Sequence, residues 1–310
     1  MKMLTLDKFE EASEKVKEVT LETKLVYSDY LSDQTGNKVY LKPENMQFTG
    51  AYKVRGAYYK ISTLSEEERQ RGLITASAGN HAQGVAYAAK CYGCKAVIVM
   101  PTTTPLIKVN RTKSYGAEVV LYGDVYDEAC AHALELAEKN GYTFIHPFDD
   151  LAVATGQGTI AMEIFKELPL VEYILVPIGG GGLATGVSTL AKLLNPKIKV
   201  IGVEPEFFIK DEFQHEGMTK LIVTKDMFER KSKMIELGDV FIAFPGGTGT
   251  LEEITEVMSK VSLKHLNAPC ILYNLNGYYN SLKALLAHMI EAGPFLQGAA
   301  GGNLFCRESG

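Results

Sequence analysis

The chain has 310 residues, of which 46% are hydrophobic and 22% charged, and its formal net charge is -5. This length predicts two domains or one large α/β unit, and the negative charge argues against nucleic acid or an anionic membrane as the main partner. No apolar run is long enough to cross a membrane, and the opening residues MKMLTLDKFEEASEKVKEV predict a charged amphipathic helix rather than a signal peptide. We therefore expect a cytoplasmic protein.

From about residue 70 onward, short β-rich runs alternate with segments that are apolar at three- and four-residue spacing. Several runs are apolar throughout, as expected of parallel strands covered on both faces. We therefore predict an α/β fold of open parallel sheets with helices on both faces. The predicted strands are GLITAS, KAVIVMP, AEVVLYG, YTFIHP, YILVPIG, KVIGVEP, KLIVTK, DVFIAFPG and APCILYN, and the predicted helices include NHAQGVAYAAKCY, DVYDEACAHALELAEKN and TLEEITEVMSKVSLKHL.

Cys91 and Cys94 form a C-x-x-C pair in the segment KCYGCKA. Such a pair can be half of a zinc site or a redox pair, but no second pair or nearby histidine completes a site here. We favour a helix that ends at Gly93, with both cysteines as small apolar fillers.

Two loops that follow predicted strands are rich in glycine: PIGGGGLATG at 177–186 and FPGGTGTLEE at 244–253. In α/β folds ligands bind beyond the carboxyl ends of the strands, where loops lead into helices. Consecutive glycines let backbone N–H groups converge on a phosphate at the positive end of the next helix. The sequence therefore predicts a phosphate-binding site at Gly179 to Gly182.

Three motifs occur in order in the first two thirds of the chain: ENMQFTGAYKVRGA at 44–57, SAGNHAQG at 77–84 and the tetraglycine. Together with VMPTTTPLIKVNRTKSYGAEVVLYG, HPFDD and TGQGT, they make residues from about Leu21 to Glu206 resemble the fold-type II pyridoxal-phosphate enzymes. The resemblance is greatest to the catabolic threonine dehydratases and their serine dehydratase and serine racemase relatives. Three ordered motifs are more specific than one pattern.

The resemblance implies pyridoxal 5′-phosphate as cofactor and a role for each matching residue. Lys53 would be catalytic and would form the Schiff base with the cofactor, while Asn80 would hydrogen-bond the ring hydroxyl. The segment from Ser77 to His81 would bind the substrate carboxylate, as helix N-termini bind anions. The implied phosphate ligands are Gly179, Gly180, Gly181 and Gly182, and the implied substrate-binding residues are Ser77, Gly79 and His81.

The implied reaction is elimination from L-threonine or L-serine to ammonia and a 2-oxo acid, with the lysine amine as general base. Racemase-like sequences carry a serine base just before GNH, where this chain has Ala78. A methyl group moves no proton, so racemisation is disfavoured. Glu204 matches a glutamate of a cation site in these relatives, but Lys210 stands at its acidic partner's position, and we predict no metal.

The segment after Glu206 resembles the carboxyl-terminal half of the lonely-guy-type phosphoribohydrolases, which cleave nucleoside 5′-monophosphates. MFERK at 227–231 fits M-x-x-R-K, and PGGTGTLEE at 245–253 fits P-G-G-x-G-T-x-x-E. A guanidinium binds phosphate, and a carboxylate can stabilise a breaking glycosidic bond. The resemblance implies that Arg230 and Glu253 are catalytic and that the phosphate ligands are Gly246, Gly247, Gly249 and Thr250.

The chain therefore reads as an apparent chimera joined near VIGVEP. Residues 1–205 would form the dehydratase-like region, with a small domain at about 45–145 inserted in an incomplete large domain. Residues 206–310 would form a Rossmann-like half-domain that lacks its own first strand. The GGN at 301–303 resembles a dehydratase signature without its serine, and we interpret it as coincidence.

Three functions stay open on the sequence alone. The first is a threonine or serine ammonia-lyase, and the second is a phosphoribohydrolase that takes a nucleoside monophosphate. The third is a non-catalytic phosphate or nucleotide binder, or an inactive fusion. We expect a homo-oligomer, either a dimer or a tetramer.

Overall fold

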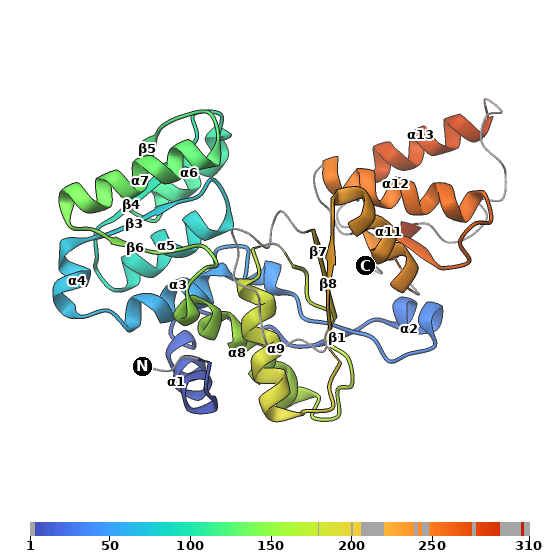
Figure 1. Ribbon diagram of the computed structural model, residues 1–310, viewed down its shortest axis with the longest axis horizontal. Helices are drawn as coiled ribbons and strands as arrows, with labels where there is room; N and C mark the ends of the chain where they lie inside the picture. The colour runs from blue at the N-terminus through green and yellow to red at the C-terminus, as the bar shows by residue number, and fades with distance from the viewer. Residues whose placement is uncertain are drawn as a thin grey trace. The chain divides into compact units, whose positions relative to one another are not determined.

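The chain forms two compact units, each with a parallel sheet and a hydrophobic core of its own (Figure 1). The first unit is Met1–Val26 with Lys42–Ile222, and the second is Tyr27–Leu41 with Val223–Gly310. The computed structural model describes residues 4–178, 180–199, 201–205, 220–238, 241–243, 248–274, 277–291 and 305–306.

A four-stranded sheet lies in the first unit, with the strand order β5-β4-β3-β6. Every pairing in it is parallel, and the register sets Leu73 opposite Ala96 and Val97 opposite Glu118. Four of the predicted strands are thereby confirmed. Their bounds are β3 Leu73–Ala76, β4 Ala96–Met100, β5 Glu118–Leu121 and β6 Thr143–Phe144.

Both faces of this sheet are covered, which explains why β3 and β4 are apolar throughout. Helix α7 (Tyr126–Asn140) packs on one face, and α5 (Asn80–Cys91) packs on the other (Figure 1). Alternate residues of a strand point to opposite faces. Accordingly Ile74 and Val97 join the core with α7, whereas Leu73 and Ile98 join the core with α5.

A second core of the first unit forms between helices. Helix α8 (Leu151–Glu167) packs against α9 (Gly182–Leu194), α3 (Lys53–Ser62) and α1 (Leu6–Val16). Phe9 of α1 is fully buried among α8 and α9 side chains, including Ile160 and Val187. The predicted amino-terminal helix is therefore confirmed, and it belongs to the core.

The remaining elements are short. In the first unit they are η1 Glu44–Met46, α4 Glu66–Arg71, α6 Leu106–Ser114 and β7 Ile201–Pro205. The second unit contains α2 Asp29–Thr35 and β2 Tyr40–Leu41, and the division between the units falls within β1 Val26–Tyr27 and β8 Lys220–Thr224. β1 pairs with β2 and β7 with β8, each as a two-stranded sheet.

The second unit contains a parallel sheet of β11 (Phe305–Cys306), β10 (Cys270–Tyr273) and β9 (Phe241–Ala243) in that order. Helix α12 packs on β9 and β10, and its buried Ile254 and Val257 meet Leu272. In the carboxyl-terminal segment of this unit the described helices are α11 Met227–Leu237, α12 Thr248–Ser262 and α13 Asn280–Glu291.

These observations confirm an α/β fold with parallel sheets, but two details of the prediction are wrong. YILVPIG forms no strand within its described part, 173–178, where Tyr173 makes a single bridge to Lys199 and Leu175 is 88% exposed. An extended segment without a ladder partner cannot become a strand. Cys91 is exposed and so fills no core, although α5 does end there and Gly93 has a positive φ of 65°.

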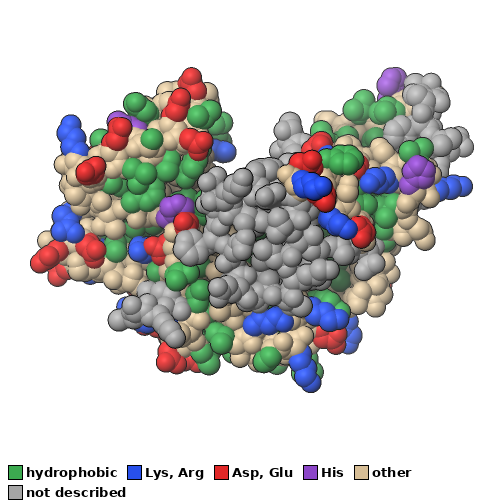
Figure 2. All heavy atoms as spheres, viewed as in Figure 1, with side chains coloured by type: hydrophobic (Ala, Val, Ile, Leu, Met, Phe, Trp, Pro, Cys, Tyr) green, Lys and Arg blue, Asp and Glu red, His purple; other side chains and the backbone are tan. Residues whose placement is uncertain are grey.

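Within the described residues, none of the helices is long and apolar enough to span a membrane. On the face drawn in Figure 2, acidic and basic side chains are interspersed rather than gathered into one field. The described side chains on that face therefore form no single-sign patch suited to a polyanion or polycation.

Candidate functional site

Lys53 is the first residue of α3. Its Nζ donates a hydrogen bond to the carbonyl oxygen of Pro147 at 2.7 Å and lies 5.6 Å from the centre of the Tyr52 ring. None of the described carboxylates pairs with it, and burial lowers the pKa of its ammonium group to about 8. The amine is therefore nucleophilic near neutral pH, as carbonyl chemistry requires.

The segment SAGN leads from β3 into α5, which begins at Asn80 with Gly79 as its N-cap. The hydroxyl of Ser77 accepts a hydrogen bond from the N–H of Gly79 at 3.2 Å and shapes this turn. Asn80 is exposed, and Ala78, which lies between Ser77 and Gly79 in the chain, is half-buried. The free N–H groups of this first turn can hold an anion such as a carboxylate.

His81 lies in the same turn but is only 3% exposed. Its Nε2 is 3.0 Å from the carbonyl oxygen of Ile145, which can only accept, so Nε2 carries the proton. Burial, and then the positive charge of Lys53, lowers the pKa of His81 to about 3. Its Nδ1 is buried without a hydrogen-bond partner in the described part of the chain, so the neutral ring keeps a free acceptor in the site.

The glycine-rich loop enters α9 through Gly181, whose φ of 74° favours glycine. At Gly180 an added Cβ would lie 2.4 Å from Cγ of Phe148, so only glycine permits this approach. The loop thus leads into the N-terminus of a 13-residue helix, a position where an anion is stabilised. Gly182 begins α9, and Gly179 lies outside the described residues.

Residues 145–149 bring these three parts together. Ile145 accepts from His81, Pro147 accepts from Lys53, and Phe148 packs against Gly180. The sequence offered HPFDD only as part of the resemblance, and this segment was not predicted to belong to the site. Its histidine and proline at the carboxyl end of the predicted strand YTFIHP were the available signal, because ligands of parallel sheets bind at that end.

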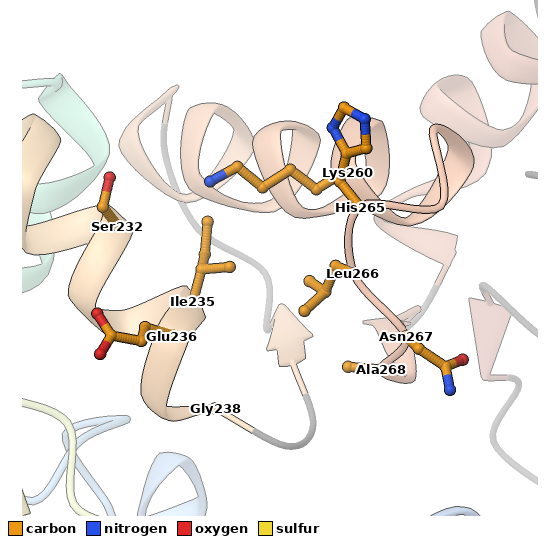
Figure 3. Close-up of a pocket in the computed structure, with 9 residues that line it drawn as sticks. All are labelled: Ser232, Ile235, Glu236, Gly238, Lys260, His265, Leu266, Asn267 and Ala268. Atoms are coloured by element: carbon orange, nitrogen blue, oxygen red, sulfur yellow. The ribbon is translucent and has the colours of Figure 1, made fainter.

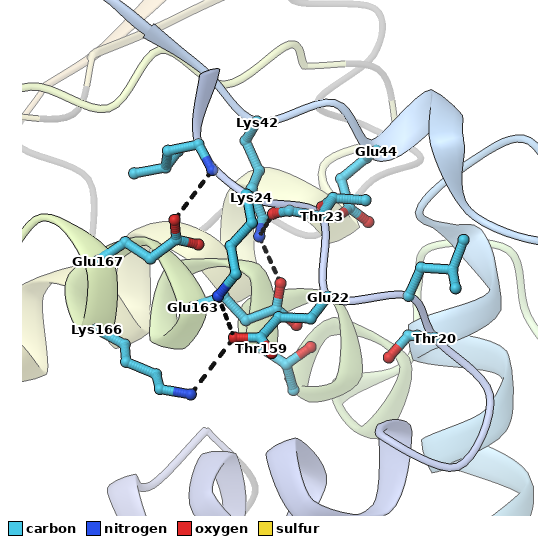
Figure 4. A network of polar contacts seen from close by, with 12 residues as sticks. Thr20, Glu22, Thr23, Lys24, Lys42, Glu44, Thr159, Glu163, Lys166 and Glu167 are labelled. Carbon is cyan, nitrogen blue, oxygen red and sulfur yellow. Dashed lines mark hydrogen bonds and ion pairs between the residues drawn. The ribbon is translucent and has the colours of Figure 1, made fainter. Parts of the chain in front are cut away.

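Arg55, two residues after Lys53 in the chain, belongs to a buried network of ion pairs. Arg55 is fully buried, and its guanidinium contacts Glu44 at 2.8 Å and Glu163 at 2.6 Å. Glu163 also pairs with Lys42 at 2.5 Å (Figure 4). Two cations and two carboxylates balance, so the network joins α3 to α8 and η1 without an unpaired charge.

The second predicted set lies in the second unit. Arg230 of α11 donates from Nη1 to Oε1 of Glu253 on α12 at 2.9 Å, so the structure brings this predicted pair together. Gly249 and Thr250 lie in the first turn of α12. Gly246 and Gly247 lie outside the described residues, as do the side chains of Glu204 and Lys210.

A groove of about 620 Å³ also lies in the second unit (Figure 3). It is lined by Ser232, Ile235, Glu236 and Gly238 from α11 and its end, by Lys260 of α12, and by His265, Leu266, Asn267 and Ala268 before β10. The groove lies at the amino end of β10, whereas ligands of parallel sheets bind at carboxyl ends. It holds none of the predicted site residues.

Comparison with known proteins identifies the family of the chain. The family model described as "Pyridoxal-phosphate dependent enzyme" matches residues 16–251, which is most of the chain. The chain therefore belongs to the pyridoxal-phosphate dependent enzyme family. The match extends past Glu206, where the sequence predicted a second pattern to begin.

The relatives reported below are named as enzymes that act on L-threonine. The chain is 54% identical over 204 residues to an L-threonine ammonia-lyase of Thermotoga maritima, which covers 66% of this chain and 51% of that protein. It is 40% identical over 285 residues to the L-threonine dehydratase catabolic TdcB of a Staphylococcus aureus strain, covering 92% and 78%. With several of these relatives it shares only about half to three fifths of their length.

Solved structures show the same fold. Threonine deaminase isoform 2 from Solanum lycopersicum is 48% identical with a TM-score of 0.61, covering 65% of this chain and 57% of that one. Serine racemase from Dictyostelium discoideum is 31% identical with a TM-score of 0.64, covering 77% and 87%. Lyases and racemases thus share this architecture, and individual site residues have to distinguish them.

Proposed function

We propose that the chain is a pyridoxal-phosphate dependent ammonia-lyase that converts L-threonine or L-serine to a 2-oxo acid and ammonia. The observation that carries this proposal is the partly buried Lys53 amine with its lowered pKa, which donates a hydrogen bond to the carbonyl oxygen of Pro147 and pairs with no described carboxylate. The names of the relatives support the same reaction.

The residues present fit the cofactor. Lys53 supplies a nucleophilic amine for its aldehyde, and the exposed Asn80 is available to its ring hydroxyl. The N-terminus of α9 at Gly180 to Gly182 is suited to its phosphate. When bound, pyridoxal phosphate supplies an electron sink for the electrons of the broken Cα–H bond.

The protein's own groups would perform the remaining work. The backbone N–H groups from Gly79 to His81 would hold the substrate carboxylate and orient the Cα–H bond. The Lys53 amine would take the Cα proton at Nζ, and the β-hydroxyl would leave as water. Water returns when the nitrogen is released as ammonia, so the net reaction of threonine gives 2-oxobutanoate and ammonia. The methyl group of Ala78 offers no base on the other face, which favours elimination.

The decisive experiment is to purify the protein with pyridoxal phosphate, record its visible absorbance, reduce it with borohydride and map the labelled peptide. A stoichiometric label on Lys53, with 2-oxo acid formed from threonine, is expected. Lys53→Ala should abolish both, whereas Lys90→Ala on the exposed side of α5 should leave both unchanged. Unchanged turnover in Lys53→Ala would eliminate the proposal.

We also propose the finer features of the architecture. Residues 206–310 would form a Rossmann-like half joined to a dehydratase-like region at 1–205, and the parallel β9 and β10 with α12 between them support this. The protein would act in the cytoplasm as a homo-oligomer. Light scattering on a size-exclusion column tests the last point, because a monomeric mass would contradict it.

A second candidate function rests on the Arg230 and Glu253 pair, which lie 2.9 Å apart. This arrangement supports hydrolysis of a nucleoside 5′-monophosphate to a free base and ribose 5-phosphate, with the guanidinium on phosphate and the carboxylate at the glycosidic bond. Release of the free base from adenosine monophosphate would support this function if Glu253→Gln abolishes it. The matched control is Glu252→Gln, at the exposed neighbouring residue, which should keep the activity. No release from any nucleotide would exclude it.

A further inference from the structure

His146 carries a feature that the proposed reaction does not use. Its Nδ1 accepts two backbone hydrogen bonds, from the N–H of Asp149 at 2.7 Å and from the N–H of Phe148 at 3.3 Å. Both partners are donors, so Nδ1 must offer its lone pair and the neutral ring must carry its proton on Nε2. The side chain thus closes the turn 146–149 on itself.

This turn holds both halves of the candidate site. Its second residue, Pro147, accepts the Lys53 hydrogen bond, and its third residue, Phe148, is the surface against which Gly180 packs. The His146 ring also lies edge-on to the Phe148 ring, with centroids 4.8 Å apart. If the turn opened, the anchor lysine and the phosphate loop would lose their common support together.

We propose that His146 is a positioning residue for the cofactor site, through the acceptor at its Nδ1. The proposal rests on the proposed function, since it concerns the same site. It is distinct from ordinary packing because it depends on one acceptor atom at one place on the side chain. Asparagine carries an acceptor at the corresponding δ position, whereas the amide of glutamine lies one carbon further out.

The test compares His146→Asn with His146→Gln in the protein without added cofactor. Amide hydrogen exchange at Phe148 and Asp149 should accelerate about tenfold or more in the glutamine variant, because two hydrogen bonds are lost. In the asparagine variant the rates should stay within about threefold of wild type. His132→Gln, at a histidine on α7 that pairs with Glu135, serves as the matched control and should change neither rate.

A second readout is pyridoxal phosphate affinity, measured by absorbance titration. We expect a loss of about tenfold or more in His146→Gln and rescue in His146→Asn. If the wild-type protein binds no pyridoxal phosphate, the proposed function fails, while the exchange rates still decide the role of His146.

Two results would overturn the inference: exchange in His146→Gln as slow as in wild type, or in His146→Asn as fast as in the glutamine variant. If the glutamine variant does not fold, the nitrogen-15 spectrum of the wild-type ring decides. A proton on Nδ1 would contradict the proposal, and a proton on Nε2 with asparagine rescue would support it.

Discussion

Replacing Glu163 by glutamine should destabilise the first unit by about 3 kcal/mol. The substitution keeps the shape of the side chain but removes a charge that faces two buried cations, Arg55 at 2.6 Å and Lys42 at 2.5 Å. The Arg55 side chain is 0% exposed and that of Lys42 is 8% exposed, so water cannot replace the lost carboxylate. Breaking one member of a buried ion network leaves an uncompensated charge, which costs about 3–5 kcal/mol.

The contribution of Glu163 to stability should also depend on pH. Burial raises the pKa of Glu163, but hydrogen bonds and charge from Arg55 and Lys42 outweigh it and hold the pKa below its ordinary value of 4.5. A carboxyl whose pKa is depressed on folding contributes stability above its unfolded pKa and loses it as the pH falls through the folded pKa. The difference in the free energy of unfolding between wild type and Glu163→Gln should therefore be largest at pH 7 and should decrease below about pH 4.5.

Urea denaturation followed by circular dichroism measures the free energy of unfolding at both pH values. Glu22→Gln is the matched control, because Glu22 pairs with Lys24 and Lys166 on the surface (Figure 4) and its loss should leave the midpoint unchanged. A cost below about 1 kcal/mol for Glu163→Gln, the level of a surface pair, would refute the reasoning. The network would then not be what fixes α3 and its first residue, Lys53.

Three further predictions concern the site itself. Gly180→Ala should displace the glycine loop and lower the affinity for pyridoxal phosphate, because the new Cβ would lie 2.4 Å from the Phe148 ring. Adding Phe148→Ala to the same chain should restore part of this affinity. An unchanged affinity in Gly180→Ala alone would contradict the prediction. Lys53→Met should stabilise the cofactor-free protein by about 2 kcal/mol at pH 7. The substitution removes the free-energy cost of burying the lysine charge, and the loss of the hydrogen bond to Pro147 offsets part of this gain. Because the unfolded lysine, with a pKa of 10.5, binds its proton more tightly than the folded one, with a pKa of about 8, the gain should fade as the pH rises between these values in urea titrations. The ring protons of His81, with a pKa of about 3, should show no titration between pH 5 and 8 by nuclear magnetic resonance, and a midpoint above about 6 would refute the neutral ring.

The strands of the first sheet could be predicted because their cause is local. β3 and β4 are apolar runs of the right length, and covered parallel strands need little else. The segment 173–178 has a similar composition, yet it forms no strand because a strand also needs a neighbour to complete its hydrogen bonds. Composition reports the side chains of a segment and is silent about its neighbours.

The site shows the same limit. Lys53, Asn80 and the glycine loop stand in recognisable motifs, so each could be predicted as a site residue from a short stretch of sequence. Their common support could not, because the Lys53 to Pro147 hydrogen bond joins residues 94 apart. The Arg55 to Glu163 pair spans 108 residues, and no short pattern reports a contact at that distance.

The two functional proposals can be separated experimentally because their residues lie in different units. The contacts that join Lys53, His81 and Gly180 to residues 145–148 all fall within the first unit, whereas the Arg230 to Glu253 pair falls within the second. Glu253→Gln should therefore leave pyridoxal phosphate affinity unchanged, and Lys53→Ala should leave any nucleotide hydrolysis unchanged. A loss of cofactor binding in Glu253→Gln would show that the sites are coupled, and each proposal would then need the whole chain.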